Sequence, residues 1–149
     1  MRKILALLAA SIELVTSKGE RVKFYDDLLK DKIVILNMMY AHCDGICPTT
    51  TANLKKVRNI LRDEINHDIY VYSITVKPEQ DSPTDLAEYA KMHEVDYPKC
   101  LFLTGEPDEL DMLRHAIGFA DPNLFSRCAN ATASMSTARE LKSRVLSTV

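Results

Sequence analysis

The stretch of sequence that decides the fold is IVILNMMYAHCDGICP, residues 33–48. Its first seven residues (33–39) form a nearly continuous apolar run, which is the pattern of a β-strand covered on both faces. We therefore expect residues 33–39 to be the central strand of a sheet. Two cysteines four residues apart, Cys43 and Cys47, follow the strand and precede Pro48. Because proline is tolerated in the first turn of a helix and not later, Cys47 should lie close to a helix start and Cys43 in the loop before it.

Strand and helix patterns alternate along the rest of the chain. The segment Ser82-Pro83-Thr84-Asp85 combines an N-cap, a proline at the first helical position and a carboxylate three residues after the cap. In chain order, the expected elements are a β-hairpin at 12–24, strands at 33–39, 69–76 and 100–104, and helices after Pro48, Pro83 and Pro107, the last ending at Gly118. Strands that alternate with helices in this way predict βαβ units and an α/β fold in which helices flank a mostly parallel sheet.

The composition fits one ordinary globular domain. The chain has 149 residues, of which 46% are hydrophobic and 27% are charged, and its formal charge is −2. No dense basic run is present, so the sequence lacks the positive surface that nucleic-acid binding requires. Only four glycines occur, and they form no glycine-rich phosphate loop. We therefore expect neither a nucleic acid nor a nucleotide as a partner.

The two ends of the chain differ from this central part. A basic start, Met1-Arg2-Lys3, precedes a seven-residue apolar stretch that is too short to span a bilayer, which takes about 20 residues. We interpret residues 1–11 as a signal or anchor remnant, the one point of membrane attachment; an ordinary first strand or helix is the alternative. Residues 126–149 are mainly Ser, Thr, Ala and Arg without strand alternation, so we expect a divergent tail that forms a terminal helix or a frayed end.

The cysteine pair carries the main functional signal. In open parallel sheets, ligands bind at the carboxyl ends of the strands, which is where Cys43 and Cys47 are expected. A helix N-terminus favours a thiolate over a thiol, because its unpaired N–H groups and its dipole carry positive charge. Two soft thiolates side by side suit Cu(I) or, alternatively, a reversible disulfide. The spacing of the two cysteines on a turn allows either chemistry.

Two further sites near the pair contain groups that bind metals in other proteins. His42 adjoins Cys43 and is a candidate nitrogen ligand, but we expect an exposed loop histidine because adjacent residues usually point in different directions. Met38 and Met39 carry soft sulfur, yet on a buried strand we expect them to pack in the core.

The remaining candidates are interpreted as structural. Cys100 opens a short apolar strand, where a buried and inert cysteine is expected. Cys128 lies in the divergent tail and is taken as a bystander. Asp81 shows no paired arrangement with another carboxylate, so we interpret it as a helix cap or a surface charge.

The run from Phe24 to Thr104 contains ordered blocks of a known family. The matching blocks are Phe24–Lys30, Cys43-x-x-x-Cys47-Pro48, Thr51-x-Asn53-Leu54, Tyr72–Thr75, Pro78–Pro83 and Phe102–Gly105. Together they resemble the SCO/SenC copper chaperones of the thioredoxin superfamily. The resemblance implies a thioredoxin-like fold, which we expect over residues 12–125.

The resemblance also implies a function. In that family the two cysteines that match Cys43 and Cys47 bind copper together with a distal histidine, and they can also cycle as a disulfide. The implied role is that of a chaperone for the copper centre of cytochrome oxidase, in the periplasm or anchored in the inner membrane and facing it. The expected partners are copper, as Cu(I) with Cu(II) left open, and a cytochrome oxidase subunit or another copper or thiol protein. The alternative is an enzyme, a thiol–disulfide oxidoreductase that uses the same pair, because redox cycling needs only the two sulfurs.

The sequence also departs from the family pattern. No histidine follows Ile117, the region where the family has its distal ligand. Beyond Leu124 the tail replaces the strands that the family has, so we expect a divergent, truncated or frameshifted end and an incomplete copper site. A sheet without its last strands would expose an edge. In addition, Lys77 stands where the family usually has an aspartate.

Overall fold

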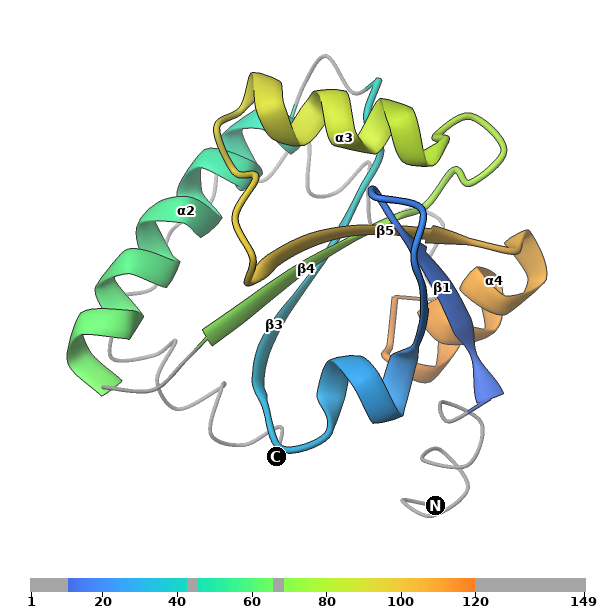
Figure 1. Cartoon of the computed structure of the whole chain (residues 1–149), viewed down its shortest axis with the longest axis horizontal. Helices are drawn as coiled ribbons and strands as arrows, with labels where there is room; N and C mark the ends of the chain where they lie inside the picture. Colours follow the sequence, from blue (N-terminus) through green and yellow to red (C-terminus); the bar gives the residue numbers. More distant parts are fainter. Residues whose placement is uncertain (1–10, 43–45, 66–68, 120–149) are drawn as a thin grey trace.

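A five-stranded sheet with helices on both faces forms the body of the protein (Figure 1). The structure is a computed structural model that describes residues 11–42, 46–65 and 69–119. The strands are β1 (Glu13–Thr16), β2 (Arg21–Lys23), β3 (Ile33–Met39), β4 (Ile69–Thr75) and β5 (Cys100–Gly105). The helices are the π-helix η1 (Phe24–Leu29) and the α-helices α2 (Ile46–Ile65), α3 (Pro83–Met92) and α4 (Pro107–Ala116). The predicted α/β fold is confirmed, and every helix and strand predicted between residues 12 and 118 is present.

The strands follow one another across the sheet in the order β2-β1-β5-β4-β3. β3, β4 and β5 run parallel, whereas β1 is antiparallel to both β2 and β5. The parallel register brings the carboxyl ends of β3 and β4 together, because Met39 lies opposite Thr75. This end of the sheet leads directly into the cysteine segment.

The prediction that residues 33–39 form the central strand is wrong for the part of the chain that the structure describes. There, β3 is the last strand of the sheet and pairs only with β4. Residues 33–37 are half-buried, and only Met38 and Met39 at the carboxyl end of the strand are buried. The apolar run correctly indicates a strand. It does not indicate the position in the sheet, because that position depends on which backbone groups find a partner.

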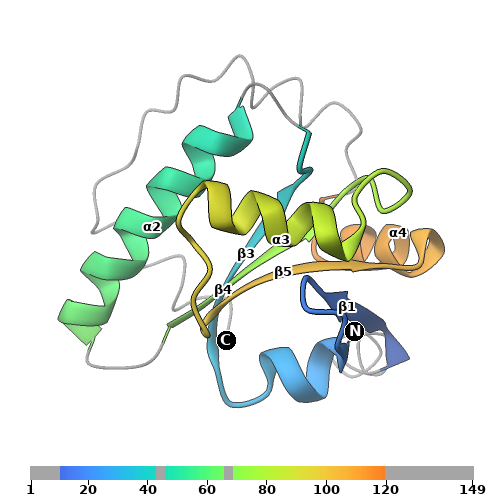
Figure 2. The ribbon, with the colours of Figure 1, turned by 45° about the horizontal axis from the view of Figure 1, so that its top comes forward.

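Each face of the sheet carries its own apolar core. Helices lie over both faces (Figure 1 and Figure 2). Successive residues of a strand point to opposite faces, so neighbours in sequence belong to different cores. Met38 and Leu103 pack in the core that includes residues of η1 and α4. Met39 and Phe102 pack in the core that includes residues of α3. The sheet is therefore covered on both sides, as the α/β pattern predicts.

The N-terminal hairpin is confirmed, but its second strand is shorter than expected. Gly19 in the turn has φ of +82°, a left-handed conformation that glycine adopts without strain. β2 stops at Lys23, whose amide donates a hydrogen bond to Oδ2 of Asp27 (2.7 Å). Phe24, expected in the strand, instead begins η1 and is buried.

The two predicted end regions lie outside the described residues. These are nearly all of the signal or anchor segment at 1–11 and the whole divergent tail at 126–149, so both assignments stay predictions. Within the described ranges, no helix has the length and apolar character needed to cross a membrane.

Candidate functional site

The candidate site lies where β3 leads into α2. β3 ends at Met39 and α2 begins at Ile46, so Cys47 lies in the first turn of the helix, as the sequence predicts. Cys43 lies outside the described part of the chain. The roles of Cys43 and Cys47 in metal binding or redox chemistry therefore stay predictions.

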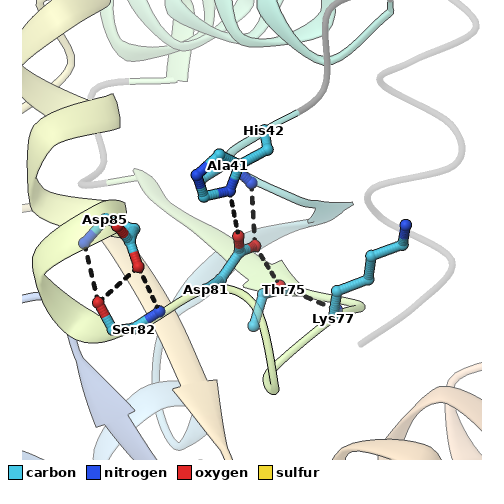
Figure 3. A network of polar contacts seen from close by, with 7 residues as sticks. All are labelled: Ala41, His42, Thr75, Lys77, Asp81, Ser82 and Asp85. Atoms are coloured by element: carbon cyan, nitrogen blue, oxygen red, sulfur yellow. Dashed lines mark hydrogen bonds and ion pairs between the residues drawn. The ribbon is translucent and has the colours of Figure 1, made fainter.

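A buried carboxylate, Asp81, holds the segment that runs from β3 toward the cysteines (Figure 3). The Asp81 side chain has no exposed surface. Its Oδ2 accepts hydrogen bonds from the Ala41 amide (2.9 Å) and from Thr75 Oγ1 (2.6 Å). Its Oδ1 lies 3.3 Å from Nδ1 of His42. Asp81 is thus linked both to the end of β4 and to the two residues directly before Cys43.

The interpretation of Asp81 as a helix cap or surface charge is wrong. The cap of α3 is the next residue, Ser82, whose hydroxyl oxygen accepts a hydrogen bond from the Asp85 amide (3.3 Å). In return, Oδ2 of Asp85 accepts one from the Ser82 amide (2.8 Å), which confirms the predicted capping box. The hydrogen bonds from Ser82 lower the pKa of Asp85. The turn of residues 77–81 directs the Asp81 side chain inward, where it is fully buried.

His42 is exposed, as the sequence predicts, with 62% of its side chain accessible. Its Nδ1 nevertheless faces Oδ1 of Asp81, a partner that sequence reasoning missed (Figure 3). With Asp81 as a carboxylate, Nδ1–H is the donor in this contact. This contact turns the imidazole ring toward Asp81 directly before Cys43.

Lys77 borders the same network. Its amide donates a hydrogen bond to Oγ1 of Thr75 (3.0 Å), so the Thr75 hydroxyl is free to donate to Asp81. The Nζ of Lys77 lies 4.6 Å from the centre of the Tyr40 ring, a cation–π contact. A positive charge thus stands at this end of the sheet.

The other candidate ligands do not form a site with these groups. Met38 and Met39 are 7% and 1% exposed and pack in the two cores, as expected. Among residues 11–42, 46–65 and 69–119, no cluster of three or more His, Cys, Asp or Glu side chains could hold a metal ion.

Cys100 has the buried and unreactive environment that the sequence predicts. It is a free thiol at the start of β5 and is 9% exposed. Burial raises its pKa to about 11, an effect that the nearby Arg58 guanidinium only partly offsets. Because the thiolate is the reactive form of cysteine, Cys100 is inert at neutral pH. Cys128 lies outside the described residues.

Comparison with known proteins identifies relatives of this chain. The family model described as SCO1/SenC matches residues 5–120. The SCO1 protein homolog of Bacillus subtilis is 31% identical over 77 residues, which are 52% of this chain and 39% of that protein. The chain spans less than half the length of the first three curated relatives it matches.

Two solved structures are similar in fold. The copper-bound crystal structure of yeast Sco1 is 27% identical, with a TM-score of 0.62 over 70% of this chain and 55% of that chain. The structure of BsSco, described as having a disulfide switch and as a member of the Sco family of cytochrome c oxidase assembly proteins, is 26% identical. Its TM-score is 0.59, over 68% of this chain and 58% of that chain. Since the family model covers most of the sequence and the fold agrees, this chain belongs to the SCO1/SenC family.

Proposed function

We propose that the chain binds copper through Cys43 and Cys47 and serves as a chaperone for the copper centre of cytochrome oxidase. The observation that carries this proposal is the Cys43-x-x-x-Cys47 pair at the connection from β3 to α2, with Cys47 in the first helical turn. Family membership supports it, as does the copper bound to yeast Sco1. The description of BsSco supports the link to cytochrome c oxidase.

The chemistry of the pair favours Cu(I). Thiolates are soft ligands, and Cu(I) is the soft form of copper; Cu(II) prefers nitrogen and oxygen ligands. The backbone N–H groups in the first turn of α2 stabilise negative charge, which favours the thiolate of Cys47. No histidine follows Ile117 in the sequence, so the two sulfurs are proposed as the principal ligands.

A second function, thiol–disulfide exchange, uses the same pair. It is favoured by the disulfide switch described for BsSco and by the lack of a histidine after Ile117. The Cys43 thiolate would attack a disulfide of a partner protein, form a mixed disulfide and release one partner thiolate. Cys47 would then attack Cys43, which releases the second partner thiolate and leaves a Cys43–Cys47 disulfide. Two electrons pass from the pair to the partner.

The location of the protein is part of the proposal. We assign residues 1–11 as a signal or anchor remnant, residues 12–125 as the thioredoxin-like domain and residues 126–149 as a divergent tail. The basic start and the apolar stretch at 4–10 support a position in the periplasm, or on the inner membrane facing it. Fractionation of cells that express the full chain tests this assignment, and recovery of the protein only from the cytoplasm would contradict it.

The decisive experiment is an anaerobic titration of the reduced chain with Cu(I) in competition with a chromophoric chelator. We expect Cys43→Ser and Cys47→Ser each to weaken Cu(I) binding strongly, because each removes one of two soft ligands. The matched control is Cys100→Ala, which removes a thiol that burial keeps protonated, and it should bind like the wild type.

The titration distinguishes copper binding from thiol–disulfide exchange. If neither serine variant weakens binding, the copper proposal fails. If the wild type binds no Cu(I) but reduces a disulfide substrate stoichiometrically, the thiol–disulfide function takes its place.

A further inference from the structure

We propose that Asp81 is a positioning residue for the cysteine pair. Its buried carboxylate holds Ala41 and His42, the two residues that connect β3 to Cys43 (Figure 3). The inference rests on the proposed function, since it states how the fold sets the geometry of Cys43 relative to Cys47. Asp81 itself is not placed among the copper ligands.

The end of β4 holds the Asp81 carboxylate in place. Thr75 is the last residue of that strand and is fully buried. Its hydroxyl accepts from the Lys77 amide (3.0 Å) and donates to Oδ2 of Asp81 (2.6 Å), so its direction is set at both ends. The Asp81 amide donates to the Lys77 carbonyl (3.0 Å), which closes the turn that carries the side chain.

The residue that follows Asp81 is fixed as well. Ser82 and Asp85 form the capping box of α3, and α3 packs on the sheet through Leu86 and Tyr89. Asp81 therefore stands between two elements of the core, and its carboxylate has little freedom to move.

From this anchored position, Asp81 reaches a segment that has left the sheet. β3 ends at Met39, and Ala41 lies beyond the ladder with β4. The Ala41 amide instead donates to Oδ2 of Asp81 (2.9 Å), and the ring of His42 faces Oδ1 (3.3 Å). A charged acceptor forms stronger hydrogen bonds than a neutral one. The carboxylate thus replaces the missing strand partner just before Cys43.

This arrangement has a consequence for metal binding. A site with two sulfur ligands depends on the distance between them, and the position of Cys43 depends on the backbone at residues 41 and 42. Residues that orient metal ligands typically change metal affinity about 10–100-fold when they are replaced. We expect a change of that size for Asp81.

The test compares Asp81→Asn with Tyr89→Phe in the full chain. Asparagine keeps the shape but removes the charge and one acceptor oxygen. The control removes a different buried hydrogen bond, between Tyr89 Oη and Thr51 Oγ1 (2.9 Å), and leaves Ala41 and His42 untouched. Because Thr51 lies on α2, the helix of Cys47, this variant is a control for the exchange readout only. Two readouts are needed: hydrogen exchange of the Ala41 amide, followed by NMR in the metal-free protein, and competitive Cu(I) titration.

We expect Asp81→Asn to accelerate exchange of the Ala41 amide at least tenfold relative to the Ile74 amide in β4, and to weaken Cu(I) binding about 10–100-fold. Tyr89→Phe should lower the melting temperature without accelerating exchange at Ala41, and Cys100→Ala is the control for Cu(I) affinity. Unchanged exchange at Ala41, or unchanged Cu(I) affinity, in folded Asp81→Asn would overturn the proposal.

Two further results of this experiment are also informative. If Asp81→Asn does not fold, the wild type decides, because an Ala41 amide that exchanges as fast as an unprotected one contradicts its hydrogen bond to Asp81. If the wild type binds no Cu(I), the proposed function fails by itself. The exchange of Ala41 in the variant then decides whether Asp81 positions this segment.

Discussion

The hydrogen bond from Thr75 to Asp81 can be tested by removing the Thr75 hydroxyl. The change is Thr75→Val, which keeps the shape of the side chain and replaces the hydroxyl with a methyl group. The variant removes the donor to Oδ2 of Asp81 (2.6 Å) and the acceptor for the Lys77 amide (3.0 Å). Both threonine and carboxylate are fully buried, so water cannot replace the bond between them, whereas the Lys77 amide is only partly buried.

The expected magnitude follows from two opposing effects. A hydrogen bond to a charged group contributes about 1.5–3 kcal/mol, whereas burying the added methyl group returns about 0.8 kcal/mol. Loss of the bond to Asp81 should therefore lower the free energy of unfolding by about 1–2 kcal/mol. Loss of the acceptor for the Lys77 amide lowers it further. With Asp81→Asn as background, the acceptor is neutral and its bond contributes only about 0.5–1.5 kcal/mol, so Thr75→Val should cost about 1 kcal/mol less there than in the wild type.

The assay is urea unfolding of the wild type, both single variants and the double variant. The loss of the Lys77 partner is common to both backgrounds and cancels in this cycle. We expect a coupling energy of about 1 kcal/mol or more between Thr75 and Asp81. Thr104→Val at the buried end of β5 is the matched control and should show no coupling to Asp81. A coupling energy below about 0.5 kcal/mol for Thr75 and Asp81 would refute the reasoning.

Three other predictions concern groups outside this bond. Ser82→Ala should lower the free energy of unfolding by about 1 kcal/mol, because it removes the cap of α3. The control Thr84→Ala, at an exposed position in the same turn, should change it by less than about 0.5 kcal/mol. Equal effects of the two variants in urea unfolding would contradict this prediction. Cys100 has a pKa of about 11 against the usual 9.0, so it should react with iodoacetamide at pH 8 at least about a hundredfold more slowly than an exposed thiol. Mass spectrometry of digested peptides measures the labelling, and labelling of Cys100 at the rate of an exposed thiol would contradict this prediction. Burial raises the pKa of Tyr72 from 10.0 to about 12, so the tyrosine ionises at lower pH in the unfolded chain and the free energy of unfolding should fall as the pH rises from 10 to 12. Tyr72→Phe should reduce this dependence in urea unfolding at alkaline pH. The same pH dependence in the variant and the wild type would contradict the prediction.

Local signals in the sequence predicted most of the fold. Pro83 and Pro107 mark the first residues of α3 and α4, and Ser82 caps α3 with the predicted capping box. The hairpin turn at Gly19 has the left-handed backbone that a glycine in a turn indicates. These features were predictable because each depends on residues within one turn of the chain.

Features that depend on distant parts of the chain were not predictable. The apolar run of β3 indicated a strand, but the position of β3 at the sheet edge, among the described strands, depends on pairing with residues far away in sequence. The inward position of Asp81 depends on donors 40 residues earlier, at Ala41, and six residues earlier, at Thr75. No pattern in the neighbouring residues distinguishes this aspartate from an exposed one.

The candidate site was predicted in part. The position of Cys47 in the first turn of α2 followed from Pro48, because proline restricts where a helix can begin. The exposure of His42 was also predicted, whereas its contact with Asp81 was not. Cys43, the other member of the pair, lies outside the described residues, so the pairing of the two sulfurs is a matter for experiment.

X-ray absorption at the copper edge tests the central claim most directly. The full chain is loaded anaerobically with one equivalent of Cu(I), and the scatterers in the first shell of copper are counted in the wild type and in Cys43→Ser, Cys47→Ser and Cys100→Ala. The account predicts two sulfur scatterers per copper in the wild type and in Cys100→Ala, and a loss of one sulfur in each of the other variants. An unchanged sulfur shell in both Cys43→Ser and Cys47→Ser, or a wild-type shell without sulfur, would contradict it.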